Sequence, residues 1–263
     1  MVRRCAPGLV RIGLVIGAAA LAWQTGIAAR QAAPASAQEQ LPSARDIIDR
    51  YVKATGGALA FRTISSMRAL GTFSITGQKM TGQLEMMAAR PNKMLTRINV
   101  TGLGPVEEGF DGKVGWSIDP LRGPALVTGR GLEERADEAW FDAPLHGPDH
   151  VKSMTVVGKE EFDKRQVFRV KVVSVRGTEQ FELFDVATGH QAGVEATRDT
   201  PFGMVPTTTI YRDYQRFGQL TFPASVVQRI LGQEQVFVFS TYEFNTVPPA
   251  TFDLPPVIKA LIK

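Results

Sequence analysis

The chain has little cysteine, little histidine and no motif of a common catalytic site. Its single cysteine, Cys5, lies near the start, and only three histidines occur among the 263 residues. Residues 38–263 contain no cysteine, so they form no disulfide and offer neither a thiol nucleophile nor a cysteine-based metal site. A domain of this length can bury enough apolar surface to be stable without such cross-links.

Motifs of hydrolases, zinc peptidases and nucleotide-binding proteins are missing as well: there is no G-x-S-x-G, H-E-x-x-H, Walker or G-x-G-x-x-G sequence. His146 and His150 stand four residues apart, but Gly147-Pro148 between them favours a loop with solvated histidines over a metal site. The adjacent acids Glu107-Glu108 and Glu160-Glu161 would point to opposite faces of a strand, which disfavours a cooperating carboxylate pair. We therefore expect no catalytic residue, no metal and no cofactor.

The first 37 residues have the pattern of a secretory signal peptide. Three arginines precede an apolar run at 12–23, and small residues follow as far as Ala37. The run is short for a bilayer span, which favours cleavage after Ala37; the alternative is an uncleaved N-terminal anchor. We expect a periplasmic protein with a short linker at 38–42 and a single domain at 43–263.

Cleavage would also remove the basic excess of the chain. The 30 basic and 26 acidic residues give a net charge of +4. All four arginines before Gln38 would leave with the signal segment and no acidic residue would, so the remaining chain is neutral. A neutral chain has no electrostatic reason to bind nucleic acid. We expect no nucleic-acid partner, and contact with a membrane that is peripheral at most.

Alternation of apolar and polar residues predicts a mainly β domain. A helix at 44–55, with Ser43 as its N-cap and Gly56-Gly57 after its end, precedes the strands. A second amphipathic helix is expected at 131–145, and a short apolar turn at 255–262. Strands are expected at 66–76, 80–89, 93–100, 105–110, 113–119, 151–158, 166–175, 178–186, 190–199, 204–214, 221–231 and 234–244. The expected fold is a large curved antiparallel sheet, an unclosed β-barrel of about eleven strands with a few short helices over its concave apolar face.

The hairpin at 167–185 predicts a particular register. If Arg176-Gly177 forms a two-residue turn, Val172 lies opposite Phe181 and Val170 lies opposite Leu183. One face of the hairpin is then apolar, and the other carries its charged residues.

A long curved sheet with one apolar face needs a cover, and the expected helices are short. Incomplete cover leaves a cavity or groove for a hydrophobic ligand, and flexible methionines suit such a site. The alternative is that these methionines and aromatic residues form ordinary core. The residues expected to contact a ligand are Leu132, Trp140 and Phe141 on the second helix and Met86, Met94, Trp116, Phe168, Val170, Phe181 and Leu183 on strands.

Three stretches of the sequence resemble the LolA/LolB-like superfamily of periplasmic lipoprotein carriers and outer-membrane lipoprotein-sorting proteins. They are the helix that ends at Gly56-Gly57, the strand-turn-strand segment Phe110–Trp116 and the segment Asp213–Pro223. The resemblance covers nearly the whole chain after the signal segment. It implies an unclosed eleven-stranded antiparallel barrel whose helices form a lid over a hydrophobic concavity that shelters acyl chains.

The resemblance also implies roles for individual residues. The lid would be the segment around Trp140 and Phe141, and the arginine that handles lipoprotein in the family would correspond to Arg68 or Arg97. These features lead us to expect a non-catalytic carrier or binding protein for a lipid, a lipoprotein acyl group or another hydrophobic ligand. The alternative is an accessory subunit that docks on a larger protein complex of the cell envelope. A filled core with an apolar patch on the outside would favour that alternative.

Overall fold

A computed structural model describes residues 40–200 and 203–262 of the chain. The predicted signal peptide at 1–37 lies outside the described residues. The helices are α1 (Ala44–Ala54), α2 (Ala58–Arg62), α3 (Gly129–Glu138) and α4 (Pro256–Lys259), with short 3₁₀ turns η1 (Ala143–Leu145) and η2 (Pro249–Phe252). The strands are β1 (Ser66–Ile75), β2 (Thr81–Ala89), β3 (Lys93–Val100), β4 (Gly104–Phe110), β5 (Gly115–Asp119), β6 (Gly123–Val127), β7 (Val151–Phe162), β8 (Arg165–Ser174), β9 (Glu179–Asp185), β10 (Gln191–Thr200), β11 (Gly203–Phe217), β12 (Leu220–Ile230) and β13 (Gln233–Phe244).

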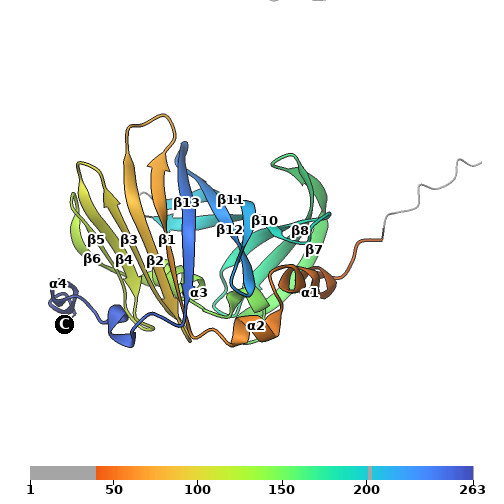
Figure 1. The fold of residues 1–263 in the computed structure, drawn as a ribbon, viewed down its shortest axis with the longest axis horizontal. Helices are drawn as coiled ribbons and strands as arrows, with labels where there is room; N and C mark the ends of the chain where they lie inside the picture. Colours follow the sequence, from red (N-terminus) through yellow and green to blue (C-terminus); the bar gives the residue numbers. More distant parts are fainter. Residues whose placement is uncertain (1–39, 201–202, 263) are drawn as a thin grey trace, which may run out of the picture. The chain divides into compact units, whose positions relative to one another are not determined.

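The thirteen strands form one antiparallel sheet in the order β6-β5-β4-β3-β2-β1-β13-β12-β11-β10-β9-β8-β7. Strands that pair in the sheet are also consecutive in sequence, with one exception. The exception is the pair of β1 and β13, which lies in the middle of the sheet. Figure 1 shows β1–β6 and β7–β11 as two walls on either side of β13 and β12. Within the described residues the sheet is open, because β6 and β7 are its two edges. The expected unclosed antiparallel barrel is confirmed, with thirteen strands where about eleven were expected.

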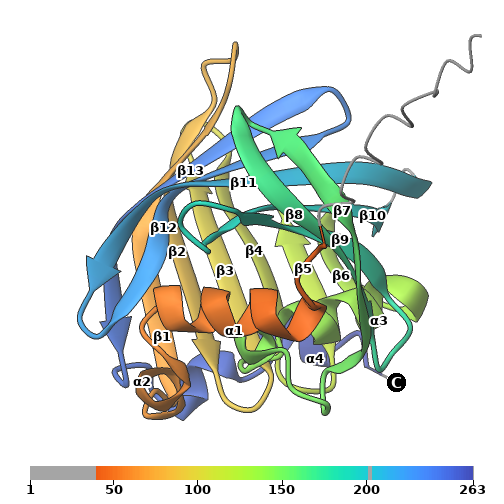
Figure 2. The same cartoon turned by 90° about the vertical axis from the view of Figure 1, so that its right-hand side faces the viewer.

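The two faces of the sheet are covered by different helices. On the inner face, α1 packs Ile47, Ile48 and Tyr51 against β7–β9, and α3 packs small residues against Phe110 of β4. On the outer face, η2 and α4 cover a cluster around Trp116. Figure 1 shows α4 outside the wall formed by β1–β6, and Figure 2 shows α1 running across the strands. The inner face is therefore the concave side of the sheet.

Local chemistry explains where α1 begins and ends. The Ser43 side chain accepts a hydrogen bond from the backbone N–H of Asp46 at 3.1 Å, as an N-cap does. After the helix, Gly56 has a φ of 116°, and a Cβ there would lie 2.5 Å from the carbonyl oxygen of Gln219. Only glycine fits this position, because it lacks the Cβ that would clash. The predicted helix at 44–55 is confirmed to within one residue.

The structure differs from the expected elements at two places, one helix and one strand. The helix predicted at 131–145 ends at Glu138, and its last part is the separate turn η1. Pro144 explains the break, since proline has no N–H and its ring clashes inside a helix. The strand β6 was not predicted because it is short and contains Pro124, which is tolerated on an edge strand.

The predicted register of the β8–β9 hairpin is wrong by one residue. Val172 lies opposite Gln180, and Val170 lies opposite Glu182. The connection is longer than a two-residue turn, because the Ser174 hydroxyl accepts hydrogen bonds from the backbone N–H groups of Arg176 and Thr178. The shift exchanges the side chains of β9 between the two faces of the sheet.

Candidate functional site

The inner face carries an apolar surface that the helices leave partly uncovered. We call it the apolar wall, and it consists of Ala69, Leu84, Met86, Ile98, Val226, Phe237, Phe239 and Tyr242. Met86, which lies between Ala69 and Thr96 in the register, is 37% exposed although it is on the concave side. Ile98, Val226 and Phe237 are half-buried. Ala69, Leu84 and Phe239 are buried, so the part of the wall that is open on the concave side is the part around Met86.

The structure brings half of the ten predicted ligand residues to the inner face. They are Met86, Met94, Phe168 and Val170 on strands and Leu132 on α3. Val170 is fully buried beneath α1, whereas Met86 is open to solvent.

The other five predicted residues lie elsewhere. Trp116 is buried on the outer face with Phe252 and Ile258. The one-residue shift places Phe181 and Leu183 on the outer face, where Phe181 contacts the guanidinium of Arg169 at 4.0 Å.

The predicted lid residues lie just after α3. Phe141 is buried in a cluster with Phe61 and Leu220. Trp140 stacks on His150 with 6.1 Å between the ring centroids. Both side chains therefore pack against the protein, and it is the residues before and after them that line a cavity.

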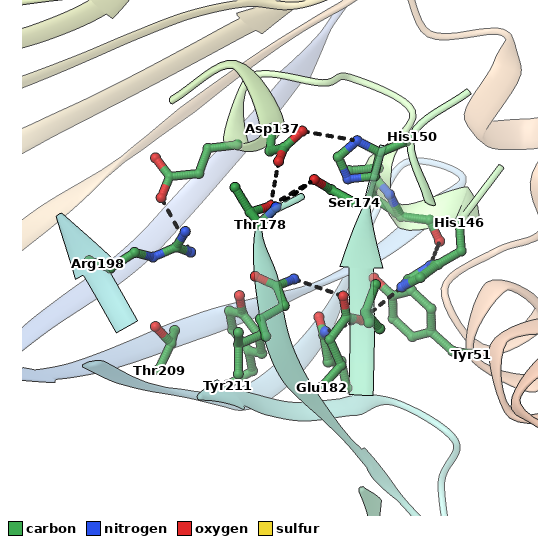
Figure 3. Close-up of a pocket in the computed structure, with 17 residues that line it drawn as sticks. Tyr51, Asp137, His146, His150, Ser174, Thr178, Glu182, Arg198, Thr209 and Tyr211 are labelled. Atoms are coloured by element: carbon green, nitrogen blue, oxygen red, sulfur yellow. Dashed lines mark hydrogen bonds and ion pairs between the residues drawn. The ribbon is translucent and has the colours of Figure 1, made fainter. Parts of the chain in front are cut away.

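This polar cavity, of about 290 Å³, lies on the inner face (Figure 3). It is bounded by α1, the end of α3, the loop around η1 and the strands β8–β11. The lining residues are Tyr51, Asp137, Glu138, Ala143, Pro144, His146, His150, Val172, Ser174, Thr178, Gln180, Glu182, Gln191, Val194, Arg198, Thr209 and Tyr211. Most of them are polar, which the apolar pattern of the sequence did not predict.

The centre of the cavity wall is a buried ion pair between His146 and Glu182. The His146 Nε2 atom lies 2.7 Å from Glu182 Oε2, and its Nδ1 atom lies 3.1 Å from the carbonyl oxygen of Pro144. Glu182 also accepts hydrogen bonds from the side-chain amides of Gln180 and Gln191, each at 2.9 Å. All polar atoms of the pair are therefore engaged.

The pKa values of the two residues agree with an ion pair. Burial by itself favours the neutral form of each. The charge and hydrogen bond of Glu182 outweigh it and raise the pKa of His146. The charge and hydrogen bond of His146 likewise outweigh burial and lower the pKa of Glu182. The sequence prediction that His146 and His150 are solvated loop histidines is wrong, since both are largely buried.

A second polar group surrounds Asp137 at the end of α3. Its carboxylate accepts hydrogen bonds from Arg176 at 2.7 Å and from the hydroxyl of Thr178. The Nδ1 atom of His150 is buried without a hydrogen-bond partner among the described residues and lies 3.9 Å from Asp137 Oδ1. Burial lowers the pKa of His150 and favours its neutral imidazole, against the opposing charge of Asp137.

The far side of the cavity is lined by Arg198, Thr209 and Tyr211. Arg198 forms an ion pair with Glu138 at 3.3 Å. These two residues also border a second groove of about 570 Å³ between α3 and β5–β6. Burial raises the pKa of Tyr211 to about 12, so its hydroxyl stays protonated.

Two expectations concerned metals and arginines. Within 40–200 and 203–262, no group of three or more histidine, cysteine, aspartate or glutamate residues is arranged to hold a metal ion. Arg68 and Arg97 lie on the outer face, where both form ion pairs with Glu85. Neither arginine reaches the apolar wall.

Comparison with known proteins identifies the fold. The structure is similar to a LolA superfamily protein from Nitrosomonas europaea, with a TM-score of 0.52, 11% sequence identity and coverage of 81% of this chain and 99% of the other. It is also similar to a putative outer membrane lipoprotein-sorting protein domain from Vibrio parahaemolyticus, with a TM-score of 0.51, 13% identity and coverage of 79% and 95%. The chain has a LolA-like fold.

A third similar structure is a DUF1329 family protein from Desulfovibrio piger, with a TM-score of 0.53, 11% identity and coverage of 80% and 96%. No protein-family model matches the sequence, and no curated protein matches it. Among the described residues, no helix of the LolA-like domain has the length and apolar character needed to span a membrane.

Several site residues could not be recognised in the sequence. Tyr51, Glu182, Arg198 and Tyr211 come from four different elements and meet only in the folded chain. The sequence held one signal for Glu182, which is the alternation of polar and apolar residues in β9. If the predicted β8–β9 register is shifted by one residue, this alternation places Glu182 on the concave side.

Proposed function

We propose that this protein is an exported, periplasmic carrier or binding protein for a lipid, a lipoprotein acyl group or another hydrophobic ligand. The observation that carries the proposal is the exposed part of the apolar wall on the concave side of the sheet. Met86 remains 37% exposed there, next to half-buried Ile98. The LolA-like fold is consistent with this function, and the predicted signal segment supports export.

The driving force for binding would be burial of apolar surface. Each methylene group removed from water contributes about 0.8 kcal/mol, so a chain of about 16 carbons gains on the order of 12 kcal/mol before the costs of ordering are subtracted. A flexible methionine at the exposed part of the wall suits chains of different shape. The wall requires no specific polar contact to hold such a chain.

The function that we propose is non-catalytic. The most enzyme-like feature is the pair of His146 and Glu182, but every ring nitrogen and carboxylate oxygen of this pair is occupied by a partner within the protein. A general base needs an atom that can reach a substrate proton. The engaged pair offers none, so its role in our proposal is to shape and stabilise the cavity.

The first test is native mass spectrometry of the protein purified gently from its own cell envelope. A stoichiometric adduct that extracts into organic solvent would support the carrier function and identify the ligand class by its mass. An apo mass together with a protein crosslinked to the domain in the envelope would contradict it, and would favour an accessory subunit.

A matched pair of variants tests whether the wall holds the ligand. Met86→Asp places a charge on the wall, and burial of an unpaired charge costs several kcal/mol, so we expect oleate binding to weaken by at least about tenfold. Met204→Asp is the control, because Met204 is 47% exposed on the outer face of β11. If Met86→Asp leaves oleate binding unchanged, or if Met204→Asp weakens it equally, the apolar wall is not the binding site.

A further inference from the structure

The charged side chains of the polar cavity already neutralise one another. Glu182 pairs with His146, Glu138 pairs with Arg198, and Asp137 pairs with Arg176 just behind the cavity lining. An anionic ligand group would meet three carboxylates whose cations are occupied. A cationic group would meet carboxylates that already accept hydrogen bonds from the protein. The charge balance of the cavity thus disfavours a ligand group of either sign.

Three hydroxyl groups of the cavity lining, by contrast, lack hydrogen-bond partners among the described residues. The hydroxyls of Tyr51, Thr209 and Tyr211 form no hydrogen bond with any other described residue. The Nδ1 atom of His150 also has no hydrogen-bond partner among the described residues, but it is buried and faces Asp137 Oδ1 at 3.9 Å. The three hydroxyls are accessible from the cavity, so water or a ligand can hydrogen-bond to them there. The three hydroxyl-bearing side chains come from α1 and β11 and line one cavity (Figure 3).

The size of the cavity and its neighbours indicate what this space could hold. A cavity of about 290 Å³ has room for a small polar group of several heavy atoms. Tyr211 lies opposite Val226 in the register, and Val226 lies opposite Phe237. Both partners belong to the apolar wall, and directly opposed side chains stand about 5 Å apart. A molecule on the wall therefore reaches the cavity past Tyr211.

We propose that the polar cavity binds the uncharged, hydroxyl-bearing head group of an amphiphile whose hydrocarbon chain lies on the apolar wall. The inference rests on the carrier function proposed above and specifies its ligand class. Hydroxyl groups donate and accept hydrogen bonds, so they match the tyrosine and threonine hydroxyls of the cavity. A glycerol or glycosyl unit has this chemistry.

Three ligands with the same chain and different head groups test the proposal: monooleoylglycerol, oleate and oleylamine. Their affinities are measured by displacement of the neutral fluorescent probe N-phenyl-1-naphthylamine. We expect monooleoylglycerol to bind at least about tenfold more tightly than the two charged ligands. Tyr211→Phe should weaken its binding by about fivefold, the effect of one neutral hydrogen bond, and leave oleate unchanged.

Tyr214→Phe is the matched control, because its hydroxyl donates to the backbone carbonyl of Gln191 at 2.9 Å and Tyr214 belongs neither to the cavity lining nor to the apolar wall. It should leave the preference between ligands unchanged. Thr209→Val removes a second cavity hydroxyl and should reproduce the effect of Tyr211→Phe, so the test stands even if one variant does not fold. Circular dichroism confirms the folding of each variant.

The possible outcomes separate this inference from the carrier function. Equal affinity for the three head groups, or a Tyr211→Phe effect that is the same for all of them, overturns the head-group site and leaves the carrier function standing. Failure of every oleyl ligand to bind overturns both. If glycerol competes as well as monooleoylglycerol, the proposal of an amphiphilic ligand is overturned, and the cavity binds a free polyol instead.

Discussion

Removal of one partner from the His146–Glu182 pair should destabilise the domain strongly. Glu182 is 5% exposed, and its carboxylate accepts three hydrogen bonds from side chains of the protein. The variant Glu182→Leu leaves the buried His146 without a counter-charge. Breaking a buried pair in this way costs about 3–5 kcal/mol. For a domain of this size, this corresponds to a decrease in Tm of about 6–20 °C.

A double-mutant cycle assigns this loss to the pair itself. Because replacing both partners by apolar residues is often nearly neutral, we expect the double variant His146→Leu and Glu182→Leu to be at least about 1 kcal/mol more stable than the sum of the single effects predicts. The free energy of unfolding is measured by urea denaturation. Additive single effects, or a Glu182→Leu cost below about 1 kcal/mol, would refute the ion pair as a stabilising unit.

The pair should also produce a pH dependence of known sign. The raised pKa of His146 means that its contribution is fully present below its ordinary value of 6.5 and is lost as the pH rises through the raised pKa. The lowered pKa of Glu182 means that its contribution is present above 4.5 and is lost as the pH falls through the lowered pKa. The stability difference between wild type and Glu182→Leu should therefore be largest between pH 4.5 and 6.5 and smaller in alkaline buffer.

Two further predictions concern packing. Gly71→Ala should destabilise the domain by about 1–3 kcal/mol, because the new Cβ would lie 2.1 Å from the carbonyl oxygen of Val238 on β13. Gly158→Ala in β7 is the control, because a Cβ there would have nothing within 4 Å. Equal thermal midpoints for the two variants would contradict the contact at Gly71. Phe141→Ala should cost about 3–5 kcal/mol in urea denaturation, because its ring is buried. Trp140→Ala should cost less than half as much, because Trp140 is only half-buried, and a larger loss would show that Trp140 is core.

The sequence determined the class of the fold and the position of most elements. Strand alternation and the cap at Ser43 are local signals, so they can be recognised without knowledge of what packs against them. They predicted twelve of the thirteen strands and placed α1 to within one residue. The same signals predicted an apolar face on a curved sheet, and the structure shows that face on the concave side.

Tertiary structure alone decided which residues make the site. The turn after β8 is widened by the Ser174 side chain, and this single-residue shift moves Glu182 to the inner face and Phe181 to the outer face. His146 then supplies the counter-charge from a loop 36 residues away. A buried charge is stable only beside a partner, and that partner comes from a part of the chain that local sequence patterns do not relate to it.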